Sequence, residues 1–266
     1  MIENLFSLQK KISLVTGAGG YLGRIICSTL AEKGSSLILV DNLGKEKNLL
    51  KRVKYFQQKY KKQKFYSFTC DFSQRRNIKN LIKNLEKFKK LDILINNAAF
   101  TGEKFSTGYI EKFEKQTTDS WNSCLDVSIT AVFDLVQNLL PKLKKSNSAS
   151  IINISSIYGV YGPDWSIYKN TKMANPAAYA VAKAGLIQFT KWLSKTLGPK
   201  IRINSISPGG IFRNQPSKFV KAYSNKTSLK RMAKEEDFIG IILLLASSAS
   251  SYITGQNIIV DGGWGS

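Results

Sequence analysis

The chain has 266 residues, of which 43% are hydrophobic, and this suffices for one large α/β domain or two small ones. Forty basic residues against 18 acidic ones give a net charge of +22. No nucleic-acid recognition motif accompanies the lysines, so the charge favours anionic small molecules over a nucleic-acid partner. Cys27, Cys70 and Cys124 are too far apart for a disulfide framework or a metal site and indicate a reducing cytoplasm. Neither a membrane span nor a signal peptide is predicted.

The first unit of the chain is a strand, a glycine-rich turn, a helix and a second strand. Apolar runs predict strands at Ile12–Thr16 and Ser36–Asp41, with a helix at 22–33 between them. Glycines in the turn let the backbone approach a pyrophosphate closely, and the helix N-terminus supplies amide donors and a favourable dipole. The pattern predicts a dinucleotide site.

Asp41 ends the second strand, where a carboxylate accepts hydrogen bonds from both hydroxyls of the adenosine ribose. It would also repel a 2′-phosphate, which favours NAD over NADP. Lys45 is close enough in sequence to soften that preference. The alternative is an acidic residue that only opens a turn.

The alternation of short apolar runs and amphipathic segments continues along the chain. It predicts helices at 45–60, 75–89 and 235–246 and strands at 64–70, 91–96 and 258–260. Asp71 follows one of these strands and Asn96-Asn97-Ala98-Ala99 ends another. Ligands collect at the carboxyl ends of parallel strands, so these residues are candidates for a cofactor site.

Segment 151–186 begins as an apolar strand-like run and ends as a helix with Tyr179 and Lys183 four residues apart. Positions i and i+4 share a helix face, so the phenol and the ammonium are expected to be neighbours. An adjacent positive charge favours the phenolate and lowers a tyrosine pKa from about 10. With Ser156 from the preceding strand end, this predicts a general base for an alcohol, although the pair alone also occurs by chance on amphipathic helices.

Taken together and in this order, the motifs resemble the short-chain dehydrogenase/reductase family over about residues 8–263. The matching elements are Thr16-Gly17 with Gly23, Asp71, Asn96-Asn97-Ala98-Ala99, Asn153-Ile154-Ser155-Ser156, Tyr179 with Lys183, Pro208-Gly209, and Gly255 with Asp261-Gly262-Gly263. The resemblance implies the α/β class: a single Rossmann-like, doubly wound domain, 1–266, with a mostly parallel seven-stranded central sheet flanked by helices. The cofactor half is expected at about 8–150 and the catalytic and substrate half at about 151–266.

The family's roles carry over by position. The resemblance implies that Ser156 holds the substrate oxygen, that Tyr179 exchanges its proton, and that Lys183 lowers the tyrosine pKa and binds the nicotinamide ribose. It implies an adenine contact for Asp71 and a carboxamide contact for Ile211. The full expected cofactor set is Gly17, Gly20, Tyr21, Leu22, Gly23, Asp41, Asp71, Phe72, Asn97, Ala98, Ala99, Tyr179, Lys183, Pro208, Gly209 and Ile211.

Two positions depart from the family pattern. Tyr21 stands where the family usually has glycine, and because tyrosine adopts a positive φ only at a cost, a reshaped turn is expected. Ser128 stands where the family often has a catalytic asparagine. Its hydroxyl can still hold a water of the proton relay behind Lys183, without the geometry of an amide.

Segment 162–175 lengthens the connection between Ser156 and Tyr179 and is expected to cover the substrate. Trp165 and Tyr168 could stack on a sugar ring; the alternative is that these aromatics pack on the protein body. The segment resembles a family branch with oxidoreductases of flagellin modification and bacterial sugar synthesis. The expected substrate lid, 211–231, carries Arg213 and several lysines, which favours a phosphorylated, nucleotide-linked or acidic substrate.

The sequence therefore predicts an NAD-dependent oxidoreductase that interconverts a secondary alcohol and a ketone, acting on a sugar or polyol derivative. The alternatives are a non-catalytic NAD-binding regulator or scaffold, motivated by Tyr21 and Ser128, and a basic nucleic-acid-associated protein. The resemblance also implies a homodimer or homotetramer, with no membrane partner and no metal.

Overall fold

A single sheet of seven strands forms the centre of the molecule. The computed structural model describes residues 2–100, 102 and 107–266, except for the side chains of residues 2 and 3. The strand order is β3-β2-β1-β4-β5-β6-β7, and every neighbouring pair is parallel. The strands are β1 (Ile12–Thr16), β2 (Ser36–Asp41), β3 (Phe65–Thr69), β4 (Ile93–Asn96), β5 (Ala149–Ile154), β6 (Ile201–Pro208) and β7 (Asn257–Val260).

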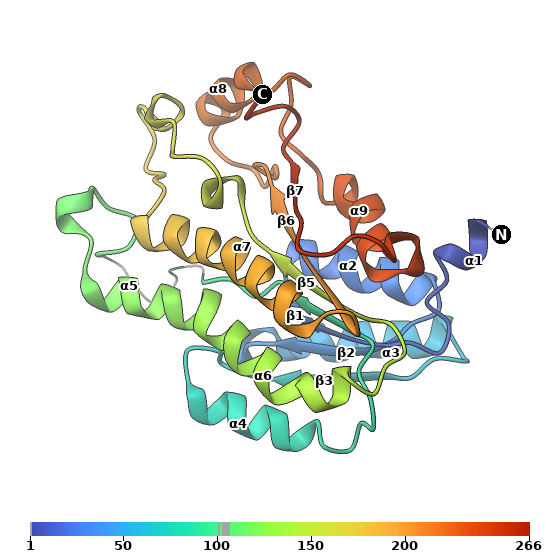
Figure 1. Cartoon of the computed structure of the whole chain (residues 1–266). Coiled ribbons are helices and arrows are strands. Elements are labelled where there is room, and N and C mark those ends of the chain that lie inside the picture. The colour runs from blue at the N-terminus through green and yellow to red at the C-terminus, as the bar shows by residue number, and fades with distance from the viewer. Residues whose placement is uncertain (1, 101, 103–106) are drawn as a thin grey trace.

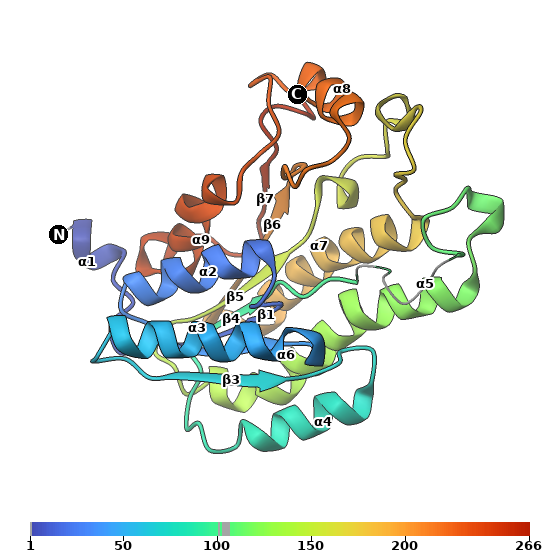
Figure 2. The same cartoon turned by 180° about the vertical axis from the view of Figure 1, so that it is seen from behind.

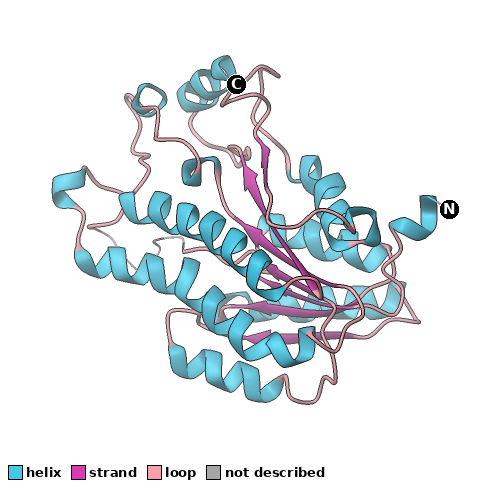
Figure 3. Cartoon of the chain, in the orientation of Figure 1, coloured by secondary structure: helices cyan, strands magenta, loops and turns pink. Residues whose placement is uncertain are grey.

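Helices cover both faces of this sheet (Figure 1, Figure 2). One face packs against α2 (Tyr21–Glu32), α3 (Glu46–Lys59) and α9 (Ile239–Ala246). The other packs against α4 (Arg75–Asn84), α6 (Ala131–Leu143) and α7 (Ala177–Leu197). The result is the three-layer arrangement that doubly wound parallel sheets require, because their strands are apolar on both faces (Figure 3).

The remaining helices lie at the ends of these layers. The short α1 (Ile2–Leu5) stands at the N-terminus, and α5 (Thr118–Leu125) continues into α6 through a π-helical turn, Asp126–Thr130. Helix α8 (Ser217–Lys226) lies near the C-terminus, beyond the carboxyl ends of the strands (Figure 1). Helices α5 and α8 therefore extend beyond the helical layers, and α1 lies apart from both, at the N-terminus (Figure 1).

The predicted strands β1 and β2 begin and end at the expected residues. Two helices are shorter than predicted. Helix α4 ends at Asn84 rather than residue 89, because the chain turns there and Phe88 packs edge-on against Tyr66 of β3. The predicted helix 235–246 begins as a 3₁₀ turn, Glu235–Phe238, before α9.

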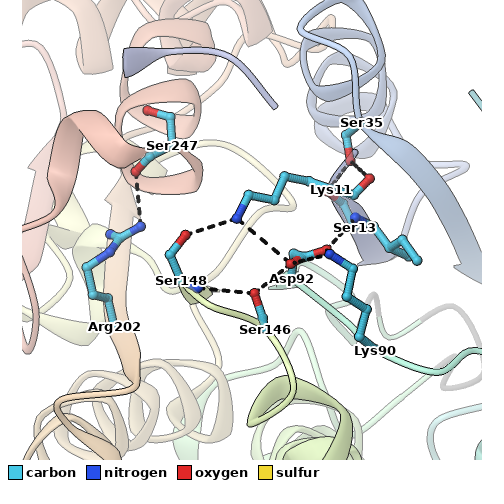
Figure 4. Close-up of polar contacts among 10 residues, drawn as sticks. Lys11, Ser13, Ser35, Lys90, Asp92, Ser146, Ser148, Arg202 and Ser247 are labelled. Carbon is cyan, nitrogen blue, oxygen red and sulfur yellow. Dashed lines mark hydrogen bonds and ion pairs between the residues drawn. The ribbon is translucent and has the colours of Figure 1, made fainter. Parts of the chain in front are cut away.

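A buried carboxylate ties the amino ends of three strands together (Figure 4). Asp92, 1% exposed, precedes β4 and accepts a 2.9 Å hydrogen bond from the Ile12 amide of β1. It also accepts from the Ser146 hydroxyl before β5 and pairs with Lys90 at 3.1 Å. A buried charge needs such partners, and here they fix the sheet at the end opposite the strand carboxyl ends.

The continuous helical segment Thr118–Leu143 is long and apolar enough, by length and composition alone, to cross a membrane. Part of that apolar character belongs to the core, since Leu135, Leu139 and Leu143 pack with the sheet and α7. The same segment also carries exposed Phe133 on its outer side. A core helix with one further apolar face accounts for the composition.

Candidate active site

The glycine-rich turn between β1 and α2 is packed too tightly for side chains. A Cβ on Gly23 would lie 2.0 Å from the carbonyl oxygen of Gly17, and Gly17 itself has φ +63°. Gly20 is the N-cap of α2 and no side chain caps the first turn. The first-turn amides of α2 therefore remain available to an anion, as a phosphate site requires.

Tyr21 is accommodated without backbone strain. It is the first residue of α2 and is not among the described residues with positive φ. The cost of a positive φ expected at Tyr21 is therefore absent, because the helix begins one residue earlier than predicted and places Tyr21 in ordinary helical conformation. Its side chain is 58% exposed.

Asp41 joins the glycine-rich turn to the end of β2. Its carboxylate accepts hydrogen bonds from the amides of Gly19, at 2.7 Å, and Asn42, at 2.8 Å. Lys45 packs beside the same turn. The carboxylate is thus held at the end of β2 with a lysine nearby, and its contact with a ribose stays a prediction.

The end of β4 is bonded directly to the end of β1. Asn97 donates from its side chain to the carbonyls of Thr16 and Gly17, at 3.0 and 3.1 Å. The amides of Asn97 and Ala98 both donate to the Thr16 hydroxyl at 3.0 Å. The strand order reverses between β1 and β4, so these bonds fix the walls of the switch point where ligands bind in open α/β sheets.

A cleft of about 520 Å³ opens at this switch point. Its lining includes these residues of the expected cofactor set: Gly17, Gly20, Tyr21, Leu22, Gly23, Asp41, Asp71, Phe72, Asn97, Ala98 and Ala99. Pro208, Gly209 and Ile211, and the residues Ser156, Tyr179 and Lys183, are not part of its lining. The lining also contains residues that the sequence did not indicate: Asn42, Cys70, Ser73, Gln74, Phe100, Gly102, Ser123, Asp126 and Val127.

Ser156, Tyr179 and Lys183 come together beyond the end of β5. Ser156 follows β5, and its hydroxyl lies near enough to the Tyr179 phenol to act on the pKa of that phenol. Lys183 is 2% exposed and donates to the Ile154 carbonyl at 2.7 Å, with its Nζ 5.6 Å from the centroid of the Tyr179 ring. The three side chains predicted to be catalytic therefore share one small region.

Burial dominates the protonation of this group. It raises the pKa of Tyr179, against the opposing effects of the Ser156 hydrogen bond and the Arg213 charge. It also lowers the pKa of Lys183, to about 8. The sequence predicted a tyrosine pKa lowered by the lysine; the direction is the reverse here, because loss of hydration disfavours the phenolate more than its surroundings favour it.

Close backbone packing holds the loop after β5 against α7. A Cβ on Gly159 would lie 2.6 Å from the carbonyl carbon of Lys183. The Ser155 hydroxyl donates to the carbonyl oxygen of Lys183 at 2.7 Å. These contacts set the distance between Ser156 and the catalytic helix. Sequence reasoning had no signal for Gly159, since its requirement comes from a helix far along the chain.

A line of buried amides and a hydroxyl crosses the sheet below this region. Asn96 of β4 donates to Asn153 of β5 at 2.8 Å, and Asn153 donates to Thr190 of α7 at 2.9 Å. The strand register pairs Asn96 with Asn153. In sequence, both asparagines looked like strand-end motif residues; in the fold, they connect the cofactor cleft to α7.

Ser128 lies fully buried inside the π-helical turn. Its hydroxyl is 3.9 Å from the Cys124 thiol, which is 3.6 Å from the Tyr109 hydroxyl. The turn packs against α7, the helix that carries Lys183. A π turn is a feature frequently found at functional sites. The relay role of Ser128 stays a prediction.

The inserted segment 162–175 packs against α8. Tyr168 is 9% exposed, its ring centroid is 5.5 Å from that of Phe219, and its hydroxyl is bonded to that of Tyr158. Asp164 forms an ion pair with Lys226 at the end of α8. Tyr168 is thus a packed wall residue, as the alternative interpretation expected, while Trp165 remains 56% exposed.

Comparison with known proteins identifies the family to which this fold and this site belong. The family model described as Enoyl-(Acyl carrier protein) reductase matches residues 17–265. The chain is 32% identical over 261 residues to the post-translational flagellin modification protein A of Campylobacter coli, covering 97% of this chain and 99% of that one. The chain belongs to the short-chain dehydrogenase/reductase family. A 3-oxoacyl-(acyl-carrier-protein) reductase of Thermotoga maritima is also 32% identical, over 262 residues, 96% of this chain and 98% of that one.

Solved structures agree with this assignment. A short-chain dehydrogenase of Leptospira borgpetersenii with bound NAD+ is 33% identical, with a TM-score of 0.81 over 99% of this chain and 95% of that one. The Pseudomonas aeruginosa RhlG/NADP active-site complex is 26% identical, with a TM-score of 0.80 over 98% of each chain. The predicted Rossmann-like α/β fold is confirmed, and this short-chain dehydrogenase/reductase is an NAD(P)-dependent oxidoreductase that acts on small molecules.

The packing of Gly159 makes a prediction that can be tested against a nearby glycine. Gly159→Ala places a Cβ against the backbone of Lys183, so we expect a loss of about 1–3 kcal/mol in the free energy of unfolding and a lower kcat. Gly162→Ala is the control, because nothing lies within 4 Å of its Cβ position. Urea unfolding and steady-state kinetics measure both. Equal behaviour of the two variants would show that the close approach is unimportant.

Proposed function

We propose that this protein is an NAD(H)-dependent oxidoreductase that interconverts a secondary alcohol and a ketone on a sugar or polyol derivative. The observation that carries the proposal is that Ser156, Tyr179 and the buried ammonium of Lys183 lie together beyond the end of β5. A hydroxyl that positions the substrate oxygen, a phenol that exchanges its proton and an adjacent cation are the groups that this reaction needs.

The residues of the cleft fit a dinucleotide. Its lining begins near Asp41 and Asp71, continues along the glycine-rich turn and the uncapped N-terminus of α2, and includes Asn97. Asp41 and Asp71 supply acceptors for a ribose, and the amides of the turn and of α2 supply donors for a diphosphate. The small residues beside Asn97 form a wall of the cleft. The nicotinamide ring of such a cofactor supplies or accepts the hydride.

The chain's own groups handle the proton. Ser156 holds the substrate oxygen by hydrogen bonding, and Tyr179 gives a proton to that oxygen during reduction or takes it during oxidation. Because burial raises the pKa of Tyr179, its phenol is protonated at neutral pH, which is the form needed for ketone reduction. The Lys183 ammonium, held by the Ile154 carbonyl, stabilises negative charge that develops on the phenolate.

Phenols beside Ser156 support a hydroxyl-rich substrate. Tyr158 follows Ser156 by two residues, and its bonded partner Tyr168 brings a second hydroxyl to the same wall. Both phenols lie within electrostatic range of Tyr179. Paired hydroxyls with an apolar ring edge suit a sugar better than a long acyl chain. The similarity to a flagellin modification protein supports the same class of substrate.

Two broader proposals accompany this function. The three cysteines are free and buried, which supports a reducing, cytoplasmic location. An aromatic strip formed by Phe133 of α6 with Phe189 and Trp192 of α7 supports self-association. Adjacent ring centroids along it are 6.2 and 6.4 Å apart, and Trp192 is 59% exposed. Such a strip favours burial against a second copy in a homodimer or homotetramer.

Removal of the Tyr179 hydroxyl tests the chemistry. In Tyr179→Phe we expect turnover to fall by at least about 100-fold, because the proton donor is lost while the ring remains. Calorimetry should give an NAD affinity within about twofold of the original protein. Tyr252→Phe, at a fully exposed position, is the matched control. Retention of most activity in Tyr179→Phe would sink the proposed mechanism and favour the alternative of a non-catalytic NAD-binding regulator.

A substrate panel tests specificity. Free, phosphorylated and nucleotide-linked keto sugars, and a 3-oxoacyl thioester, are assayed with NADH and NADPH. We expect a sugar to be preferred over the thioester, and NADH over NADPH. Asp41→Ser should raise relative use of NADPH by about tenfold, because the carboxylate repels a 2′-phosphate, while Glu46→Gln on exposed α3 should not. Preference for the thioester would contradict the sugar assignment.

Disruption of the aromatic strip tests self-association. Trp192→Glu places a charge at the exposed end of the strip, so we expect the molecular mass measured by light scattering to fall to that of a monomer. Tyr55→Glu, on the opposite face in α3 and 52% exposed, serves as the control and should leave the mass unchanged. A monomeric original protein, or an unchanged mass in Trp192→Glu, would refute this surface.

A further inference from the structure

Arg213 lies on the loop after β6 yet lines the same cleft as the glycine-rich turn. Its guanidinium carbon is 4.9 Å from the centroid of the Tyr21 ring at the start of α2. On its other side, Nε is 3.2 Å from a carboxylate oxygen of Glu235. The side chain thus reaches from the lid loop to the phosphate turn, between an aromatic face and an anion.

The loop that carries Arg213 is fixed by its own hydrogen bonds. The side chain of Gln215 accepts from the Arg213 amide at 2.7 Å and donates to the Ile211 carbonyl at 2.8 Å. Asn214 takes the left-handed conformation, with φ +58°, that this tight turn needs. Flanking bonds join Phe212 and Gly210 to Ala233, at 2.8 and 2.9 Å. The backbone conformation of this loop therefore fixes the position from which the Arg213 side chain reaches the cleft.

The described part of the protein satisfies only some of the hydrogen-bond donors of the Arg213 guanidinium. Glu235 engages Nε, and in the part of the chain that the structure describes neither terminal nitrogen has a hydrogen-bond partner. Burial raises the pKa of Tyr179, and the charge of Arg213 opposes part of that rise. Among the described residues, the two terminal nitrogens of Arg213 therefore remain available at the cleft beside the phosphate turn.

We propose that Arg213 binds the diphosphate of the dinucleotide through its terminal nitrogens, and that Tyr21 and Glu235 hold it in place. A guanidinium matches phosphate oxygens in a bidentate arrangement that a lysine cannot reproduce. Stacking on Tyr21 orients its plane. The proposal rests on the NAD-binding role above and reassigns Arg213 from substrate to cofactor. It also assigns a role to Tyr21, which stands where the family usually has glycine.

Calorimetry on the full chain, without substrate, tests the proposal with NAD, ADP-ribose and adenosine as probes. We expect Arg213→Gln to weaken NAD and ADP-ribose binding by about tenfold or more and to leave adenosine within about twofold, because adenosine has no phosphate. Arg213→Lys should recover only part of the loss. Arg24→Gln is the matched control, because Arg24 also contacts the Tyr21 ring, at 5.5 Å, but does not line the cleft.

A double-mutant cycle separates positioning from folding. Tyr21→Leu should weaken ADP-ribose binding several-fold in the original background and have no effect in Arg213→Gln, because it acts only through the arginine. Equal losses for adenosine and ADP-ribose, or unchanged ADP-ribose binding in Arg213→Gln, would overturn the inference. Failure of the unmodified protein to bind NAD at all would instead refute the proposed function.

Discussion

The ammonium of Lys183 is the constraint around which the region beyond the end of β5 is arranged. A lysine that is 2% exposed needs a partner for its charge, and the Ile154 carbonyl at the end of β5 provides it. That bond requires α7 to lie directly on the strand end, which only a glycine at 159 permits. Ser156 is then carried to Tyr179 as a consequence. The buried charge, its backbone acceptor and the close approach of loop and helix form one unit.

The two ends of the sheet have different tasks. At the amino ends, Asp92 satisfies its buried charge with a strand amide, a hydroxyl and two lysines (Figure 4). At the carboxyl ends, Asn97 bonds the end of β4 to the end of β1. The reversal of strand order leaves a cleft beside these two strand ends. The bonds of Asp92 stabilise the sheet at the amino ends of its strands, which permits an open site with exposed amide donors at the carboxyl ends.

The inserted segment and the lid loop give this chain its individual character. Tyr168 and Asp164 join the insert to α8 by ring packing and an ion pair, so these two segments form one packed unit. Arg213, on the same lid loop, reaches across to the phosphate turn. The stretch from Arg213 to α8 therefore connects the cleft at the switch point to the inserted segment.

The sequence by itself determined the elements whose signals are local. The apolar runs of β1 and β2, the glycine turn and the motif residues Ser156, Tyr179 and Lys183 could all be predicted because each depends on spacing along the chain. Only the tertiary structure decided features that join distant segments. The pKa of Tyr179 follows from burial beneath other elements, the need for Gly159 from a helix that packs on it, and the place of Arg213 from a loop that crosses the cleft. Hydration and steric contact depend on what surrounds a residue in space, and a linear pattern does not contain that information.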